Sequence, residues 1–200
     1  MPTSNKVKFG LRNVHYAPLT LGSDNTYSFG TPVPIPGAVD LSMEANGEPS
    51  VFYADCIAYY VTNNNNGYNG DLEIALIPDS FRTACLSETL DSANVLVEDS
   101  NAEPSPFALL FEFKGDQKHI RHVLYNCVAS RPSVSGKTDE ENKDVQTEKL
   151  SLSALPLPDG KVKAKTGDST SSTVYDAWYT TVHVPSSSSS SSSGSGTTGG

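Results

Sequence analysis

Two histidines, His119 and His122, are the first residues in this chain whose types and spacing could do chemistry. Two imidazoles three residues apart share one face of a helix and could bind a metal ion together there. These two, however, fall in a segment that alternates like a strand, in which residues three apart point to opposite faces. His15 and His183 have no acidic or cysteine neighbour at a useful spacing. We therefore predict no metal site.

Two carboxylates, Glu73 and Glu112, could act as the acid and nucleophile of a glycoside hydrolase if neighbouring strands brought them together. Both lie in the polar phase of an alternating segment, so solvated strand faces account for them. The chain has no GxSxG or HExxH motif and no cysteine with an obvious histidine partner. The run Gly67-Tyr68-Asn69-Gly70 is typical of a turn and has no helix after it, which excludes a phosphate-binding loop. We predict no catalytic residue, no cofactor-binding residue and no cofactor, and hence no enzyme.

Two aromatic pairs, Phe52-Tyr53 and Tyr59-Tyr60, could form a platform on which sugars stack. Consecutive residues of a strand point to opposite faces, so we expect one member of each pair in the core. The other member could lie at a subunit interface, where tyrosine is enriched.

The three cysteines, Cys56, Cys85 and Cys127, form no CxxC pair, and the chain has no N-glycosylation sequon. This pattern favours folding in a reducing cytosol and three buried or half-buried thiols.

The elements that would position these residues are mostly strands, because apolar and polar residues alternate along much of the chain. The alternating positions are Val7, Phe9 and Leu11; Val39, Leu41, Met43 and Ala45; Leu72, Ile74 and Leu76; Phe107, Leu109, Phe111 and Phe113; Ile120, His122, Leu124, Asn126 and Val128; Leu150, Leu152 and Ala154; and Val162 with Ala164. Each such strand is expected to have one buried and one solvated face, as in antiparallel sheets.

Turn residues divide these strands. Asn66-Gly67 predicts a hairpin between strands near 56–62 and 70–77, and Lys114-Gly115-Asp116 predicts another between 106–114 and 118–130. The prolines at 32, 34 and 36 keep 31–37 extended but out of the middle of a sheet.

Two short helices and two irregular segments complete the prediction. Residues 78–86 and 171–180 carry apolar residues at helical spacing, namely Phe81, Ala84 and Cys85, and Val174, Ala177 and Trp178. Asp79 or Ser80 would cap the first helix, and Ser171 or Ser172 the second. Residues 135–149 are polar and predict a long flexible loop, and the Ser/Gly-rich residues 185–200 predict a disordered tail.

Composition limits the class of protein. The 200 residues carry a net charge of −9, which argues against a cationic face that neutralises nucleic-acid phosphates. No apolar run approaches the roughly 18 residues of a spanning helix, and the N-terminus has no apolar signal core, so we expect neither membrane anchoring nor export. The predicted fold is all-β, a sandwich or barrel of eight to ten strands with one or two short helices. It would occupy residues 1–184, followed by the tail 185–200.

Read in order, several segments resemble the major tail protein (tail tube protein) family of phages with long non-contractile tails. They are Val7-Lys8-Phe9-Gly10-Leu11-Arg12-Asn13-Val14-His15-Tyr16-Ala17, Pro32-Val33-Pro34-Ile35-Pro36-Gly37-Ala38-Val39, Phe52-Tyr53-Ala54-Asp55, Gly67 to Phe81, Pro106 to Phe113, Arg121 to Cys127 with Arg131-Pro132, and Tyr175 to Tyr179. The ordered series spans roughly 6–184. One departure is Leu86-Ser87, where the family tends to have Leu-Gly at the end of the first helix.

The resemblance implies a structural virion protein without catalytic residues or cofactor. Such a subunit, made in the cytoplasm of the bacterial host, would form hexameric rings that stack into the tail tube. DNA would pass through without specific binding during genome ejection. The implied partners are other copies of the chain, the tape-measure protein and the tail-terminator and initiator proteins. The Ser-rich tail could be a linker to a further domain.

Simple physics is compatible with this role. Rings need side-to-side contacts that close, a tube needs axial contacts that do not, and exposed strand edges can supply both. The loops 131–148 and 18–36 are candidates to become ordered on stacking, and acids facing the lumen would repel DNA. Two alternatives stay open: a carbohydrate-binding β-sandwich using Tyr59 or Tyr68, and a hydrolase using Glu73 or Glu112.

Overall fold

The computed structural model describes residues 4–138 and 145–185. In this part of the chain, antiparallel strands dominate and helices are short, so the predicted all-β class is confirmed. Thirteen strands occur there, more than the eight to ten expected, because several two- and three-residue strands carry no readable alternation. The predicted tail, apart from Pro185, and the middle of the predicted loop 135–149 lie outside the described residues. The domain boundary at 184 stays a prediction.

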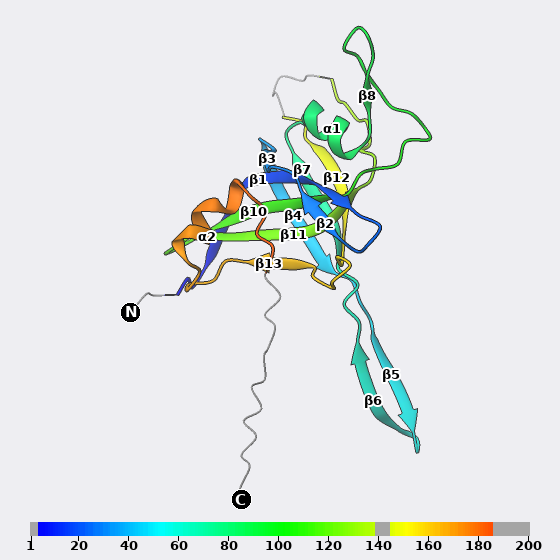
Figure 1. The fold of residues 1–200 in the computed structure, drawn as a ribbon, viewed down its shortest axis with the longest axis vertical. Helices are drawn as coiled ribbons and strands as arrows, with labels where there is room; N and C mark the ends of the chain where they lie inside the picture. Colours follow the sequence, from blue (N-terminus) through cyan, green and yellow to red (C-terminus); the bar gives the residue numbers. More distant parts are fainter. Residues whose placement is uncertain (1–3, 139–144, 186–200) are drawn as a thin grey trace, which may run out of the picture.

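One large sheet organises the molecule (Figure 1). Its strands are β1 (Lys8–Leu21), β2 (Tyr27–Phe29), β3 (Val33–Pro34), β4 (Ala38–Ala45), β7 (Tyr68–Ile74), β10 (Phe107–Gly115), β11 (Ile120–Ala129), β12 (Glu148–Leu155) and β13 (Lys163–Lys165). The order is β2-β1-β10-β11-β12-β7-β4, with β3 paired to β1 and β13 paired to β11. The predicted hairpin at Lys114-Gly115-Asp116 is confirmed as the β10–β11 connection.

The sheet curls so that β4 contacts β1, and strands β4, β7 and β12 share one core with β1, β10 and β11. This is the main core, and Leu72, Phe107 and Leu150 are almost completely buried in it. The inward positions predicted for β12, namely Leu150, Leu152 and Ala154, are confirmed. Val39 and Phe9, in contrast, are exposed, because each lies where the strand register shifts.

Strand β10 is buried on both faces, which corrects the expectation of one wet face per strand. Its second face holds Ala108 and Leu110, which pack under the C-terminal segment with Trp178 and Val182. Strand β11 also departs from simple alternation. A register shift opposite Phe107 to Leu109 brings Leu124 and Cys127 into the same core, although they are three residues apart.

The two predicted helices exist, but their details differ. Helix α1 (Asp79–Cys85) buries Phe81 and Cys85, and its N-cap is Pro78 rather than either expected residue. The second segment forms α2 (Ser172–Asp176), capped by the Ser171 side chain, and then the 3₁₀ turn η1 (Ala177–Tyr179). This tightening leaves Ala177 exposed while Trp178 stays buried.

The end of α1 accommodates Ser87 where the resembling family has glycine. Ser87 adopts φ +58°, in the left-handed region. Its hydroxyl donates to the Glu103 carbonyl oxygen at 2.7 Å, which ties the helix end to the chain that returns from the excursion beyond it. That excursion carries a small hairpin of β8 (Thr89–Leu90) and β9 (Leu96–Val97). Among the described residues, no helix is long and apolar enough to span a membrane.

Candidate interaction surfaces

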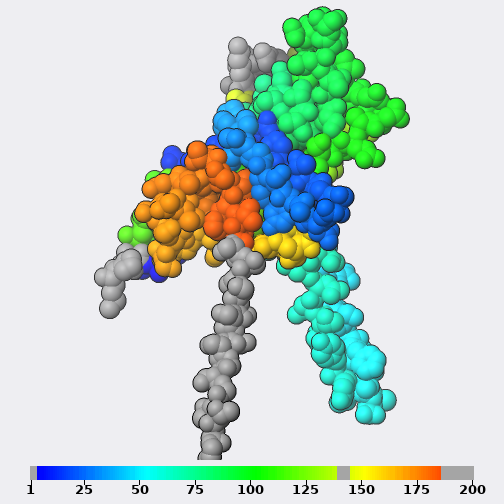
Figure 2. Space-filling model, viewed as in Figure 1, coloured from blue at the N-terminus to red at the C-terminus, as the bar shows by residue number. Residues whose placement is uncertain are grey.

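A two-stranded arm projects from the body of the molecule (Figures 1 and 2). It comprises residues 46–66 and contains β5 (Pro49–Ala54) and β6 (Ile57–Asn63), which pair only with each other. The two strands meet at a tight turn whose central residues, Asp55 and Cys56, have φ +53° and +62°. This combination is typical of the hairpin turns that match the twist of the strands.

The prediction of a hairpin at Asn66-Gly67 is therefore wrong, because β6 pairs with β5 and β7 pairs with β4. The backbone at position 67 nevertheless requires a glycine. The ladder runs on from β4 and β7 into the arm, because the Asn46 N–H donates to the Gly67 carbonyl and the Asn66 N–H donates to the Asn46 carbonyl. Gly67 has φ +94°, and a Cβ there would overlap the Ala154 carbonyl oxygen. It thus marks the point where the ribbon leaves the sheet, and the chain turns about ten residues earlier instead.

The arm exposes an unusual amount of apolar surface on both faces. Its side chains that are more than half exposed are Phe52, Tyr53, Ile57, Tyr59, Tyr60 and Val61. An isolated two-stranded hairpin is marginally stable in water, and contiguous exposed apolar surface usually marks a contact with a partner. The expectation that one member of each aromatic pair lies in the core is wrong, because no layer formed by the described residues covers either face of the arm.

All charged side chains of the arm are negative. Its charged residues are Glu48 and Asp55, and no lysine or arginine occurs anywhere between Arg12 and Arg82. The arm therefore combines apolar side chains with an acidic tip, and it fits a partner surface that is apolar and rimmed by cations.

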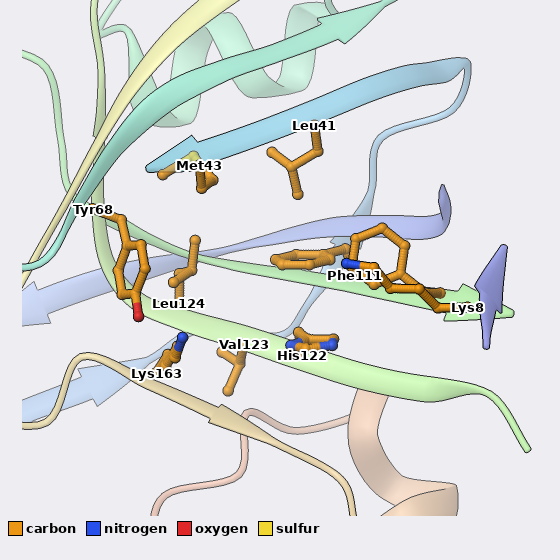
Figure 3. Close-up of a pocket in the computed structure, with 10 residues that line it drawn as sticks. Lys8, Leu41, Met43, Tyr68, Phe111, His122, Val123, Leu124 and Lys163 are labelled. Atoms are coloured by element: carbon orange, nitrogen blue, oxygen red, sulfur yellow. The ribbon is translucent and has the colours of Figure 1, made fainter. Parts of the chain in front are cut away.

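A groove with these properties lies in the body, between β4 and the strands β10 and β11 (Figure 3). Its volume is about 230 Å³. The side chains that line it are Leu41, Met43, Tyr68, Phe111, Phe113, His122, Val123 and Leu124, with Lys8 and Lys163 at the rim. We call it the lysine-rimmed groove. The Lys8 Nζ lies 4.6 Å from the centre of the Phe113 ring, and the Lys163 Nζ lies 4.4 Å from that of Tyr68.

His122 is held between an aromatic ring and several lysines at this groove. Its ring stacks on Phe111 with the planes 2° apart and the centres 5.2 Å apart. Burial, together with the nearby charges of Lys165, Lys8 and Lys163, lowers the pKa of His122 to about 4. The imidazole is therefore neutral near pH 7, and the lysines supply the positive charge of this surface.

A second charged surface, which we call the acidic face, covers the outside of β4 and β7. It consists of Asp40, Glu44, Asp71 and Glu73. Asp40 lies directly opposite Glu73 in the strand register, an arrangement of like charges that weakens strand pairing. The neighbouring strand β12 supplies partners to another carboxylate of this face: the Ser151 hydroxyl donates to Asp71 at 2.7 Å, and the Lys149 Nζ lies 3.8 Å from the Asp71 carboxylate.

The carboxylate pair considered for a hydrolase does not form. Glu112 lies on β10 and Glu73 on β7, and β11 and β12 separate these strands in the sheet. The prediction that both are solvated is wrong for Glu112, which is 1% exposed. Glu73 is half-buried at the acidic face and accepts a hydrogen bond from the Thr147 hydroxyl.

Glu112 is instead the centre of a buried hydrogen-bond network. Its carboxylate accepts from the Asn13 amide at 2.8 Å, His119 Nδ1 at 2.8 Å, Arg121 Nε at 3.2 Å and the Tyr179 hydroxyl at 3.2 Å. Burial alone would raise the Glu112 pKa, but the hydrogen bonds from His119 and Tyr179 and the charge of Arg121 hold it below its usual value. Through these four hydrogen bonds, the Glu112 carboxylate connects β10 to β1, to β11 with the residue before it, and to the C-terminal segment. Its role is therefore structural.

The two histidines singled out for metal binding point to opposite sides, as the strand pattern predicts. His119 contacts Glu112, whereas His122 stacks on Phe111. Within the described ranges, no three side chains of histidine, cysteine, aspartate or glutamate are grouped so that they could hold a metal ion.

Two of the three cysteines are buried, as expected, and burial raises the pKa of the Cys85 and Cys127 thiols to about 12. Cys56 is exposed at the tip of the arm, which corrects the expectation of a buried or half-buried thiol. Tyr59 is exposed on the arm, whereas Tyr68 is half-buried under Lys163 in the lysine-rimmed groove.

Comparisons with known proteins find a structural likeness but no likeness in sequence. No protein-family model matches the chain, and no curated protein matches it by sequence. Among solved structures, the chain is similar to the one described as the cryo-EM structure of the anti-feeding prophage cap (AFP tube terminating cap). The two chains are 9% identical, with a TM-score of 0.46, and the match covers 80% of this chain and 93% of that chain.

Proposed function

We propose that this chain is a structural subunit that assembles with copies of itself into the tube of a phage tail. The observation that carries the proposal is the arm, because no described residue outside the arm covers its two faces and because these faces and its acidic tip suit a contact between copies. The ordered sequence resemblance to tail tube proteins supports the same role. In this proposal six copies form a ring, rings stack, and the subunit belongs to the virion tail after synthesis in the bacterial cytoplasm.

In this proposal the acidic face lines the lumen of the tube. Carboxylates on the outside of β4 and β7 would repel DNA phosphates over about 10 Å at 0.1 M salt, so that the genome slides without binding. This placement would also explain why Asp40 and Glu73 lie opposite each other. Their repulsion weakens the pairing of β4 with β7, but both carboxylates would help to repel DNA from the channel. Tape-measure and terminator proteins would meet the lumen and the tube end.

Negative-stain electron microscopy over a concentration series tests the proposal. We expect sixfold rings and hollow tubes that grow in number with protein concentration. A protein that stays monomeric at every concentration and binds glycans through Tyr59 would contradict it and favour the carbohydrate-binding module, since the arm also exposes aromatic rings suited to sugars.

A further inference from the structure

The rim of the lysine-rimmed groove carries charge that the described residues leave unsatisfied. Lys8, Lys163 and Lys165 surround His122, and within the described residues none of the three has a carboxylate within 4 Å. Lys8 and Lys163 lie instead over aromatic rings, a contact that leaves their charge available to an incoming anion. The groove therefore fits a ligand with an apolar body and a carboxylate beside it.

The strand β13, which carries two of these lysines, also has a free edge among the described strands. Ala164 faces Val123 in the β11 register, and the flanking bonds to β11 use the Val162 carbonyl and the Thr166 N–H. Because hydrogen-bonding direction alternates along an antiparallel strand, the backbone groups of Lys163 and Lys165 point away from β11. A peptide strand that enters the groove could therefore pair with this edge as well as with the lysine side chains.

The arm has the complementary chemistry. Near its tip, Tyr53 and Ile57 flank the turn that holds Asp55, so an apolar body and a carboxylate occur together there. The arm cannot reach the groove of its own chain, because β4 and β7 form one wall of that groove and carry the arm away from the body (Figure 1). The Ser/Gly/Thr residues 186–200 have neither apolar nor carboxylate side chains and so lack the combination that the groove would recognise.

We propose that the lysine-rimmed groove of one subunit receives the tip of the β5–β6 arm of a second copy, with Asp55 against Lys8, Lys163 and Lys165. The contact is heterologous, since arm and groove are different surfaces at different places on the subunit. Each copy then has one arm to give and one groove to fill, so the contact propagates from subunit to subunit. This inference rests on the proposed tube function and names the surfaces that would join its subunits.

Cross-linking through the natural Cys56 tests the contact. Cys56 is exposed at the arm tip, and the other two thiols are buried. In Lys163→Cys protein, mild oxidation under assembly conditions should join neighbouring copies and give a ladder of dimers, trimers and longer species on a non-reducing gel. The ladder should vanish in the Lys163→Cys, Cys56→Ser double variant. Asp91→Cys, at the exposed β8–β9 turn, is the matched control and should give at least tenfold less cross-linking.

Charge reversal gives an independent readout. Asp55→Lys should reduce assembly measured by sedimentation at least tenfold, and adding Lys163→Glu with Lys8→Glu should restore part of it. Tubes that form normally while Lys163→Cys cross-links no better than the Asp91→Cys control would overturn this contact and leave the tube function standing. Cross-linked species that stop at the dimer would overturn the propagating arrangement. A wild-type protein that never assembles would contradict the contact and the tube function together.

Discussion

Glu112 is buried although the sequence pattern around it predicts an exposed side chain. Its place in an alternating strand predicts a solvated side chain, but the C-terminal segment with Tyr179 covers that face of β10. Asn13, which reaches the carboxylate from β1, has φ +48°, a backbone conformation that asparagine tolerates better than most residues. The register shift in β1 around Asn13 thus allows the Asn13 amide to donate to the buried Glu112 carboxylate.

Replacement of this carboxylate should destabilise the fold. Glu112→Gln removes the charge that Arg121 faces and places amide hydrogens against existing donors, so we expect a loss of about 3 kcal/mol in the free energy of unfolding. Urea denaturation measures it. The control is Glu44→Gln, an exposed position of the acidic face, which should change stability by less than about 0.5 kcal/mol. Equal stability of both variants would contradict the structural role of the Glu112 network.

His122 should make stability depend on pH. Its folded-state pKa is about 4, below the ordinary histidine value of 6.5, so the unfolded chain takes up a proton at a higher pH than the folded chain does. The free energy of unfolding should therefore fall as the pH is lowered from about 6.5 to about 4. His122→Phe, which keeps a ring against Phe111, should flatten this part of the profile. An unchanged slope in that variant would assign the pH dependence to other groups.

At the scale of elements, the β5–β6 arm contributes no residue to either hydrophobic core of the described chain. Seen in Figure 2, it stands clear of the body, and its aromatic side chains meet solvent on both faces. The body is held by two cores on either side of β10, neither of which includes an arm residue. Folding and assembly should thus be separable by mutation.

Phe52→Ser with Tyr60→Ser tests that separation. The two residues are paired across the hairpin and both are more than 60% exposed. We expect the melting temperature of the unassembled subunit to change by no more than a few degrees, and assembly measured by sedimentation to fall at least tenfold. Leu76→Ser is the matched control, because Leu76 is equally exposed but lies outside the arm. Loss of assembly in the control as well would point to a general effect of lost apolar surface.

At the scale of the whole molecule, charge is unevenly distributed. Between Arg12 and Arg82 there are eight carboxylates and no lysine or arginine. They are Asp24, Asp40, Glu44, Glu48, Asp55, Asp71, Glu73 and Asp79. In the folded chain, carboxylates lie on the acidic face of β4 and β7 and at the tip of the arm, whereas lysines lie at the lysine-rimmed groove. The separation suits a subunit whose neighbours are copies of itself.

In the proposed tube, reversal of charge on the acidic face should replace the repulsion of DNA by binding. Tubes of Asp40→Lys, Glu44→Lys protein should co-sediment with double-stranded DNA at low salt and release it as salt rises, because phosphate neutralisation is salt-dependent. Wild-type tubes should not bind. The same charge change at Asp91 and Asp99, on the β8–β9 excursion, is the control. If tubes with the changes at Asp91 and Asp99 bind DNA and tubes with the changes at Asp40 and Glu44 do not, the acidic face does not line the lumen.

Short-range signals in the sequence were enough to predict the class of fold and much of its local structure. Alternation identified the inward residues of β7 and β12, turn residues placed the β10–β11 hairpin, and helical spacing located α1. These signals are readable because each depends on neighbours within a few residues.

Long-range packing, in contrast, settled which strands have a second covered face and where the ribbon from β4 to β7 turns. The burial of Glu112 depends on Tyr179, 67 residues away, and the exposure of Phe52 and Tyr60 follows from the lack of any described layer beside the arm. The lysine-rimmed groove joins side chains from β1, β4, β7, β10, β11 and β13. Local periodicity carries no information about such distant partners, because the same alternating strand is stable beside water or beside another layer.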